Sequence, residues 1–125
     1  MSESNSEGVA EVSDKELAAK IDGLLSHVWM VRTFLKHCEE AEEDDELRDV
    51  HRDLYDYMLA LGASLEDEDW AKYLKVAKRK LKRLKRARDL FNEIQPEISS
   101  HTNFQMAAES LRISVRQIID LIENR

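Results

Sequence analysis

The chain has 125 residues, a net charge of −7 and a pI near 5.1, so it is long enough for one domain with a core and has no overall attraction to nucleic acid. Its single cysteine, Cys38, excludes an internal disulfide and a thiolate metal cluster. The sequence contains three glycines and one proline, and this scarcity of turn-forming residues favours a few long helices over many short strands.

The first twelve residues are small, polar and acidic, without a hydrophobic period. We therefore expect a disordered tail over 1–12 and a single domain over 13–125. The acidic start is unlike a signal or transit peptide, and no apolar run approaches the length of a membrane span. These features predict a soluble cytoplasmic protein with no membrane partner.

A first helix is expected over about 14–41. Ser13 and Glu16 have the spacing of a capping box. From Leu17 to Cys38, apolar residues recur at alternating spacings of four and three, which is a heptad stripe. The acidic run 42–46 would destabilise the negative end of this helix and stabilise the positive start of the next, so the break is expected near 40–44.

Three further apolar stripes follow the first helix. The second predicts a helix over about 45–62, with Gly62 as the residue that ends it. The third predicts one helix over about 65–95, capped at Ser64 and ended by Pro96. The last predicts a helix over about 103–123, with Thr102 as the cap at its start. Four helices with short connections predict an all-α fold, an antiparallel up-down-up-down four-helix bundle.

Residues 72–90 carry ten Lys or Arg and one Asp, a net charge of +9, so the rest of the chain carries −16. On the third helix, six of these cations occupy the outward arc: Lys75, Lys78, Arg79, Lys82, Lys85 and Arg86. One interpretation is a solvated face, partly neutralised by acids such as Glu39, Glu40 or Asp53. The other is a surface for an anionic partner. Nucleic acid is one such partner, although Tyr73 is the only aromatic residue near enough to stack on a base.

No catalytic or metal-binding residue is predicted. None of the four histidines follows a glutamate by three residues, so the ligand pairs of di-iron bundles are missing. His51 lies on the apolar stripe of the second helix, a position typical of a hydrogen-bonded residue at the edge of a core. No Ser, Cys or Lys shows a nucleophile-and-base arrangement.

Three segments follow, in order and approximate spacing, the motifs of one family. The segment IDGLLSHVWMVRTFL, residues 21–35, is similar to a V-D-E-L-N-S-x-I-G-L-A-R helix. Residues 46–65, ELRDVHRDLYDYMLALGASL, are similar to an E-L-x-x-I-Q-x-D-L-F-D-L-G-A-E-L helix. Residues 91–123 follow the outline of a segment that ends A-A-L-H-x-A-R-T-V-x-R-R-A-E-R. The chain thus resembles the PduO-type ATP:cob(I)alamin adenosyltransferases.

That resemblance implies a helical bundle, usually a trimer, which binds ATP and cobalamin between subunits and transfers the adenosyl group to cobalt. Asp22, Arg112 and Arg116 match family positions. The resemblance implies a salt bridge between Asp22 and Arg116 across a subunit interface, next to the nucleotide site.

The chain also departs from the family. Residues 1–12 contain nothing like the T-R-T-G-D-x-G-x-T stretch that wraps the triphosphate, and Gln117, Ile119 and Asp120 replace later motif residues. The resemblance therefore implies a shortened relative that has lost ATP-dependent catalysis and keeps oligomerisation and binding. Two alternatives stay open: an active adenosyltransferase in which Arg112 replaces the lost loop, and an interaction module that uses the cations of the third helix.

Overall fold

The computed structural model describes residues 12–124, and all of the regular structure in that range is α-helical. Six helices follow one another: α2 (Asp14–His37), α3 (Glu40–Glu43), α4 (Asp45–Glu66), α5 (Trp70–Arg79), α6 (Leu81–Ile98) and α7 (Thr102–Glu123). The all-α prediction is confirmed, with six helices where four were expected. The predicted tail lies outside the described residues except for Val12.

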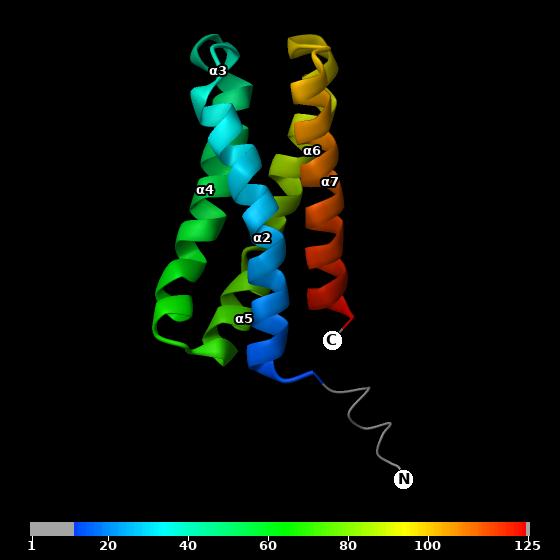
Figure 1. Ribbon diagram of the computed structural model, residues 1–125. Helices are drawn as coiled ribbons and strands as arrows, with labels where there is room; N and C mark the ends of the chain where they lie inside the picture. The colour runs from blue at the N-terminus through cyan, green and yellow to red at the C-terminus, as the bar shows by residue number, and fades with distance from the viewer. Residues whose placement is uncertain (1–11, 125) are drawn as a thin grey trace.

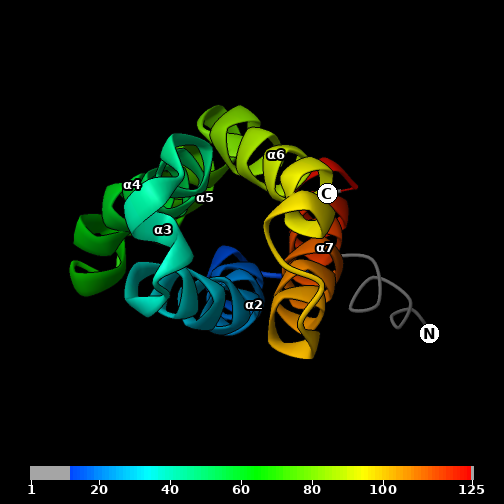
Figure 2. The same cartoon turned by 90° about the horizontal axis from the view of Figure 1, so that it is seen from above.

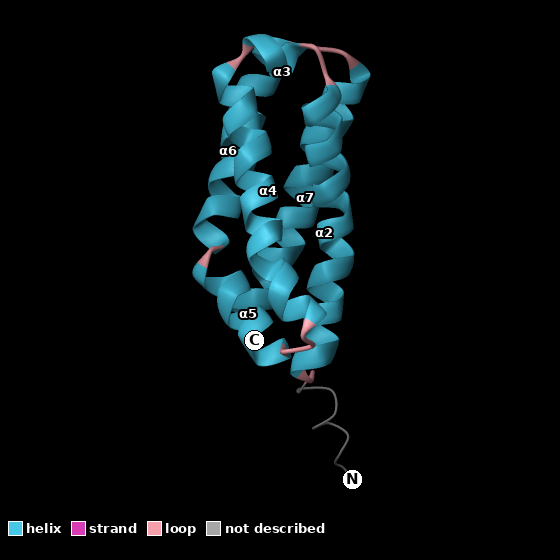
Figure 3. Cartoon of the chain, turned by 90° about the vertical axis from the view of Figure 1, so that its left-hand side faces the viewer, coloured by secondary structure: helices cyan, strands magenta, loops and turns pink. Residues whose placement is uncertain are grey.

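The helices pack antiparallel around one core. Helices α2, α4 and α7 run side by side, and α5 followed by α6 forms the remaining side (Figures 1 and 3). Viewed along the long axis, these elements surround a common centre (Figure 2). The largest interfaces join α2 to α7 and α4 to α6. Each side contributes a fully or almost fully buried leucine, namely Leu25, Leu54, Leu84 and Leu111.

The start of α2 is as expected, whereas the break after it differs. Ser13 Oγ accepts from the backbone N–H of Glu16 at 3.1 Å, and Glu16 Oε1 accepts from the N–H of Ser13 at 3.2 Å, a complete capping box. The helix ends at His37 rather than near 41, and the short α3 follows. Asp44 then caps α4, because its Oδ1 accepts from the N–H of Leu47 at 2.9 Å.

The predicted end of the second helix at Gly62 is wrong, since α4 continues to Glu66. Glu68, with φ 56°, takes the left-handed conformation that usually ends a helix at glycine. Its N–H donates to Leu65 O at 3.2 Å, and the N–H of Asp69 donates to Ser64 O at 2.9 Å, which is a Schellman motif. Ser64 is therefore buried inside α4, and Asp69 caps α5 in its place.

The predicted single helix over 65–95 is also wrong, because it is interrupted at Lys80 between α5 and α6. In a continuous helix the N–H of Leu81 would donate to the carbonyl of Ala77. That carbonyl accepts instead from the hydroxyl of Tyr57, which is fully buried on α4, at 2.9 Å. A side chain from the neighbouring helix has thus replaced one bond of the helical ladder, a recognised cause of a break.

The last two helix ends differ slightly from expectation. Pro96 lies inside the final turns of α6, which ends at Ile98. The carbonyl that loses its partner to this proline belongs to Asn92, an exposed residue, so water can satisfy it. His101 caps α7 by accepting from the N–H of Asn103 at 3.0 Å, a role that the sequence had suggested for Thr102. None of the helices within residues 12–124 is long and apolar enough to cross a membrane.

Candidate functional site

The cations of α5 and of the start of α6 lie on the outward side of these helices, because the opposite side is buried in the core. Tyr73, Leu74, Ala77 and Leu81 are all buried there. We call the outward cations of residues 72–82 the basic surface; they are Lys72, Lys75, Lys78, Arg79, Lys80 and Lys82. Five of the six are exposed and Lys80 is half-buried. No acidic residue occurs between 70 and 88 to interrupt this surface.

The cations that follow the basic surface are neutralised. Arg86 donates from Nε and Nη2 to the two carboxylate oxygens of Asp53, at 3.0 and 2.9 Å. Arg83 Nη1 lies 2.9 Å from Asp56 Oδ2, and Lys85 Nζ lies 3.0 Å from an oxygen of Glu123. Neutralisation by Asp53 was expected from the sequence, whereas Glu39 and Glu40 form no ion pair with these cations.

The six members of the basic surface form no ion pair with any of residues 12–124. The predicted outward arc therefore divides in two. Lys75, Lys78, Arg79 and Lys82 remain unpaired, while Lys85 and Arg86 are bound by acids of α7 and α4. Beside the surface is a hollow of about 370 Å³ between α2, α5 and α7, lined in part by Lys75 and Lys78.

The residues singled out by the adenosyltransferase resemblance do not meet within one chain. Asp22 on α2 and Arg116 on α7 are both exposed, and neither has an ion pair in the described range. Arg112 is held by Glu109, one turn earlier on α7, through two hydrogen bonds of 3.1 and 2.7 Å. These bonds raise the pKa of Arg112 and lower the pKa of Glu109.

A further polar cluster, centred on Arg32, joins α2 and α4. The Arg32 side chain is 6% exposed, and its guanidinium lies 3.9 Å from the ring centre of Trp29 and 5.4 Å from that of Tyr55. Its Nη1 lies 3.2 Å from His51 Nε2, and its Nη2 donates to Thr33 Oγ1 at 3.3 Å. Among residues 12–124 no carboxylate forms an ion pair with this buried cation, and stacking on the two rings stabilises it in place of one.

His51 therefore has the structural role expected of it, as a hydrogen-bonded residue at the edge of the core. The spacing of three between Trp29 and Arg32 is the sequence signal that could have indicated their stacking. The contact of Arg32 with His51 joins two helices and has no signal in a single sequence. Within residues 12–124, no three His, Cys, Asp or Glu side chains are grouped so as to hold a metal ion.

Comparison with known proteins finds no match among family models, curated proteins or solved structures. The resemblance to the adenosyltransferases accordingly stays a prediction from the sequence, and the basic surface is the feature that the described side chains support most directly.

Proposed function

We propose that this protein is an interaction module, an up-down-up-down four-helix bundle that binds a short acidic segment of a partner protein through the basic surface. One observation carries the proposal. Six cations of α5, α6 and the residue between them have no acidic partner among the described residues, although neighbouring cations on α6 are paired with acids of α4 and α7. A folded chain of net charge −7 could pair these six as well, so their unpaired state favours a partner outside the chain.

The size of the basic surface favours a short acidic segment over nucleic acid. Residues 72–82 extend roughly 16 Å along the helices at about 1.5 Å per residue. Outside residues 72–90 the chain carries −16, which would repel a long polyanion that runs beyond the basic surface. Tyr73, the aromatic residue within the basic stretch, is buried and so cannot stack on a base.

The test measures binding of a fluorescent peptide of glutamate and aspartate to the full chain by fluorescence anisotropy. Reversal of two unpaired cations, in Lys78→Glu/Lys82→Glu, should abolish binding, and the affinity of the unchanged protein should fall as salt is raised. A matched control reverses Lys15 and Lys36, two exposed lysines of α2 that lie outside the basic surface. The control should bind the peptide almost as well as the unchanged protein.

Three results would contradict the proposal: no binding at low salt, equal loss in the control variant, or tighter binding of a DNA duplex than of the peptide. The third result would retain the surface and change the partner to nucleic acid. Circular dichroism of each variant establishes that the helices are intact.

The adenosyltransferase-like bundle is a second candidate, favoured by the exposure of Asp22 and Arg116, as a pair across a subunit interface requires. It would form trimers, and in its catalytically inactive form it would bind neither MgATP nor a corrinoid productively. Light scattering tests the trimer. Adenosylation of cob(I)alamin, measured by absorbance, would establish the active enzyme, and its absence would remove that alternative.

A further inference from the structure

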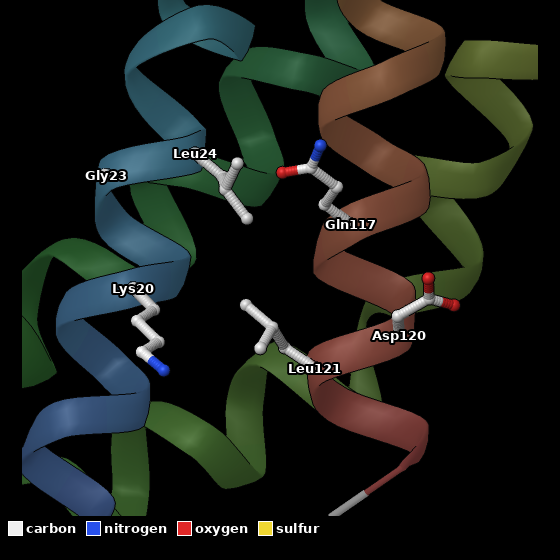
Figure 4. Close-up of a pocket in the computed structure, with 6 residues that line it drawn as sticks. All are labelled: Lys20, Gly23, Leu24, Gln117, Asp120 and Leu121. Carbon is white, nitrogen blue, oxygen red and sulfur yellow. The ribbon is translucent and has the colours of Figure 1, made fainter.

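Helices α2 and α7 leave a groove along the outer face of the bundle. Its walls are Lys20, Gly23 and Leu24 from α2, and Gln117, Asp120 and Leu121 from α7, around a volume of about 540 Å³. Leu24, Gln117 and Leu121 project into the space between the two helices (Figure 4). The groove continues along the same helices as a second hollow of about 240 Å³, whose lining includes Leu24, His27, Ile113 and Gln117.

Exposed apolar side chains extend this groove into a longer strip. Met30 is 64% exposed and lies seven residues, or two turns, after Gly23, on the same side of α2. Met106 is 58% exposed and lies seven residues before Ile113, which is itself 41% exposed, on the same side of α7. Exposed apolar side chains that recur along two packed helices are expected of a protein-binding face.

Gly23 is a second unusual feature of this face. A glycine in the middle of a helix destabilises that helix relative to alanine. A Cβ built at Gly23 would have no atom within 4 Å apart from its chain neighbours and the nearby backbone of its own helix, so packing against the other described helices does not require glycine there. Close approach of another chain along the groove would require a glycine at this position.

The charges at the groove indicate which chain that is. Lys20 stands on the α2 wall and Asp120 at the outer rim of the α7 wall at a similar level, with the Asp120 carboxylate turned away from the groove (Figure 4), and they form no ion pair with each other. A twofold axis parallel to the two helices would place α2 of one copy against α7 of the other, with levels preserved. Lys20 of each copy would then face Asp120 of the other copy, and Leu24 would face Gln117, which lies at its level on α7 (Figure 4).

We propose that this face, comprising Lys20, Gly23, Leu24, Asp120 and Leu121, is the interface of a symmetric homodimer. The same two opposite charges meet twice under the twofold operation. A foreign helix would fit the apolar strip but would not need opposite charges on the two walls. The inference is independent of the basic surface, which lies on α5 and α6, and it is incompatible with the trimer of the second candidate.

Sedimentation equilibrium of the full chain tests the dimer. The expected mass is twice 14.6 kDa. Lys20→Asp and Asp120→Lys, made singly, should each weaken dimerisation by at least about tenfold, since each places two like-charge pairs in the interface. The double variant Lys20→Asp/Asp120→Lys restores opposite charges at both contacts and should dimerise again.

Lys15→Asp serves as the matched control, because it makes the same charge change on α2 at an exposed residue outside the groove. It should leave the dimer unchanged. A monomer or a trimer at all concentrations would overturn the proposal. So would a dimer that withstands both single reversals, or a double variant no stronger than the singles. Far-UV circular dichroism of every variant separates a lost interface from a lost fold.

Discussion

The Nη1 atom of Arg32 lies 3.2 Å from Nε2 of His51, and this contact connects α2 to α4 beside two aromatic rings. A guanidinium can only donate, so His51 Nε2 must accept, and the imidazole must be neutral with its proton on Nδ1. Burial lowers the pKa of His51, and the charges of Arg32, Lys36 and Arg52 lower it further. The hydrogen bond between α2 and α4 therefore requires that His51 be neutral.

This arrangement predicts a stability that decreases in acid. Because the pKa of His51 is lower in the folded chain than in the unfolded chain, the unfolded chain binds the proton more readily as pH falls through about 6.5. The unfolding free energy contributed by His51 is thus fully present above that pH and decreases below it. Urea denaturation at pH 7.5 and 5.0 measures the loss in the unchanged protein and in His51→Gln.

His51→Gln retains an acceptor for Arg32 but cannot take up a proton. The many carboxylates titrate alike in both proteins, so the difference between the two pH dependences reports on His51 alone. The unchanged protein should lose more unfolding free energy than His51→Gln between the two pH values. An equal loss in both proteins would mean that protonation of His51 does not disturb the junction.

Replacement by phenylalanine is expected to have different effects on stability at two buried tyrosines. The hydroxyl of Tyr57 donates to Ala77 O, whereas the buried hydroxyl of Tyr73 has no hydrogen-bond partner in the described structure. Tyr57→Phe leaves a buried carbonyl without its donor and should cost about 1–2 kcal/mol. Tyr73→Phe removes an unsatisfied buried group and should be neutral or stabilising by up to about 1 kcal/mol.

Urea denaturation of both variants provides the comparison, with each tyrosine as the control for the other. Burial raises the pKa of both hydroxyls above their ordinary value, so both remain protonated under the conditions of the measurement. Equal losses of stability would show that the bond to Ala77 contributes nothing, and would leave the break at Lys80 without its physical cause.

The end of α4 predicts a stabilising substitution. Glu68 adopts φ 56°, a conformation that costs a residue with a Cβ about 1 kcal/mol. Glu68→Gly should therefore raise the unfolding free energy by roughly 0.5–1 kcal/mol. Glu68→Ala removes the same charge but retains the Cβ, so it should give little of this gain. If thermal denaturation shows equal shifts for the two variants, the effect arises from the charge and not from the backbone.

The apolar stripes predicted the fold because they depend on many residues at once. From Leu17 to Leu35 the a and d positions are buried with the exception of Leu24, which is half-buried, and no single substitution would erase that pattern. The helix ends depended on single residues, and here tertiary contacts prevailed. Gly62 continued a helix that its own propensity would end. Tyr57 interrupted a helix at Lys80, where no glycine or proline is near in the sequence.

The candidate site was predictable to a similar extent. Helical periodicity places Lys75, Lys78, Arg79 and Lys82 on the outward side of the core, as the structure does. The pairing of each cation depends on the relative heights of the helices, that is, on how far they are shifted along the long axis of the bundle. Arg86 meets Asp53, thirty-three residues away, and Lys85 meets Glu123, thirty-eight residues away. A single sequence carries no record of those heights, and for the same reason it could not indicate the level of Lys20 and Asp120 in the groove.

The pair between Arg86 and Asp53 predicts how the basic surface can be enlarged. The Arg86 side chain is 64% exposed whereas that of Asp53 is 15% exposed, so the carboxylate holds an arginine that already faces solvent. Asp53→Asn should release Arg86 as a seventh unpaired cation beside Lys82. Binding of the acidic peptide should then tighten by about two- to fivefold, the strength of one solvent-exposed ion pair.

Glu46→Gln is the matched control, because it removes one exposed acid of α4 that has no ion pair in the described structure. Both variants change the net charge equally, so any difference in peptide affinity reports on the release of Arg86. The difference should shrink as salt is raised, since the added contact lies in solvent. Equal affinities of the two variants at low salt would mean that Arg86 is too far from the bound peptide, and would confine the binding surface to residues 72–82.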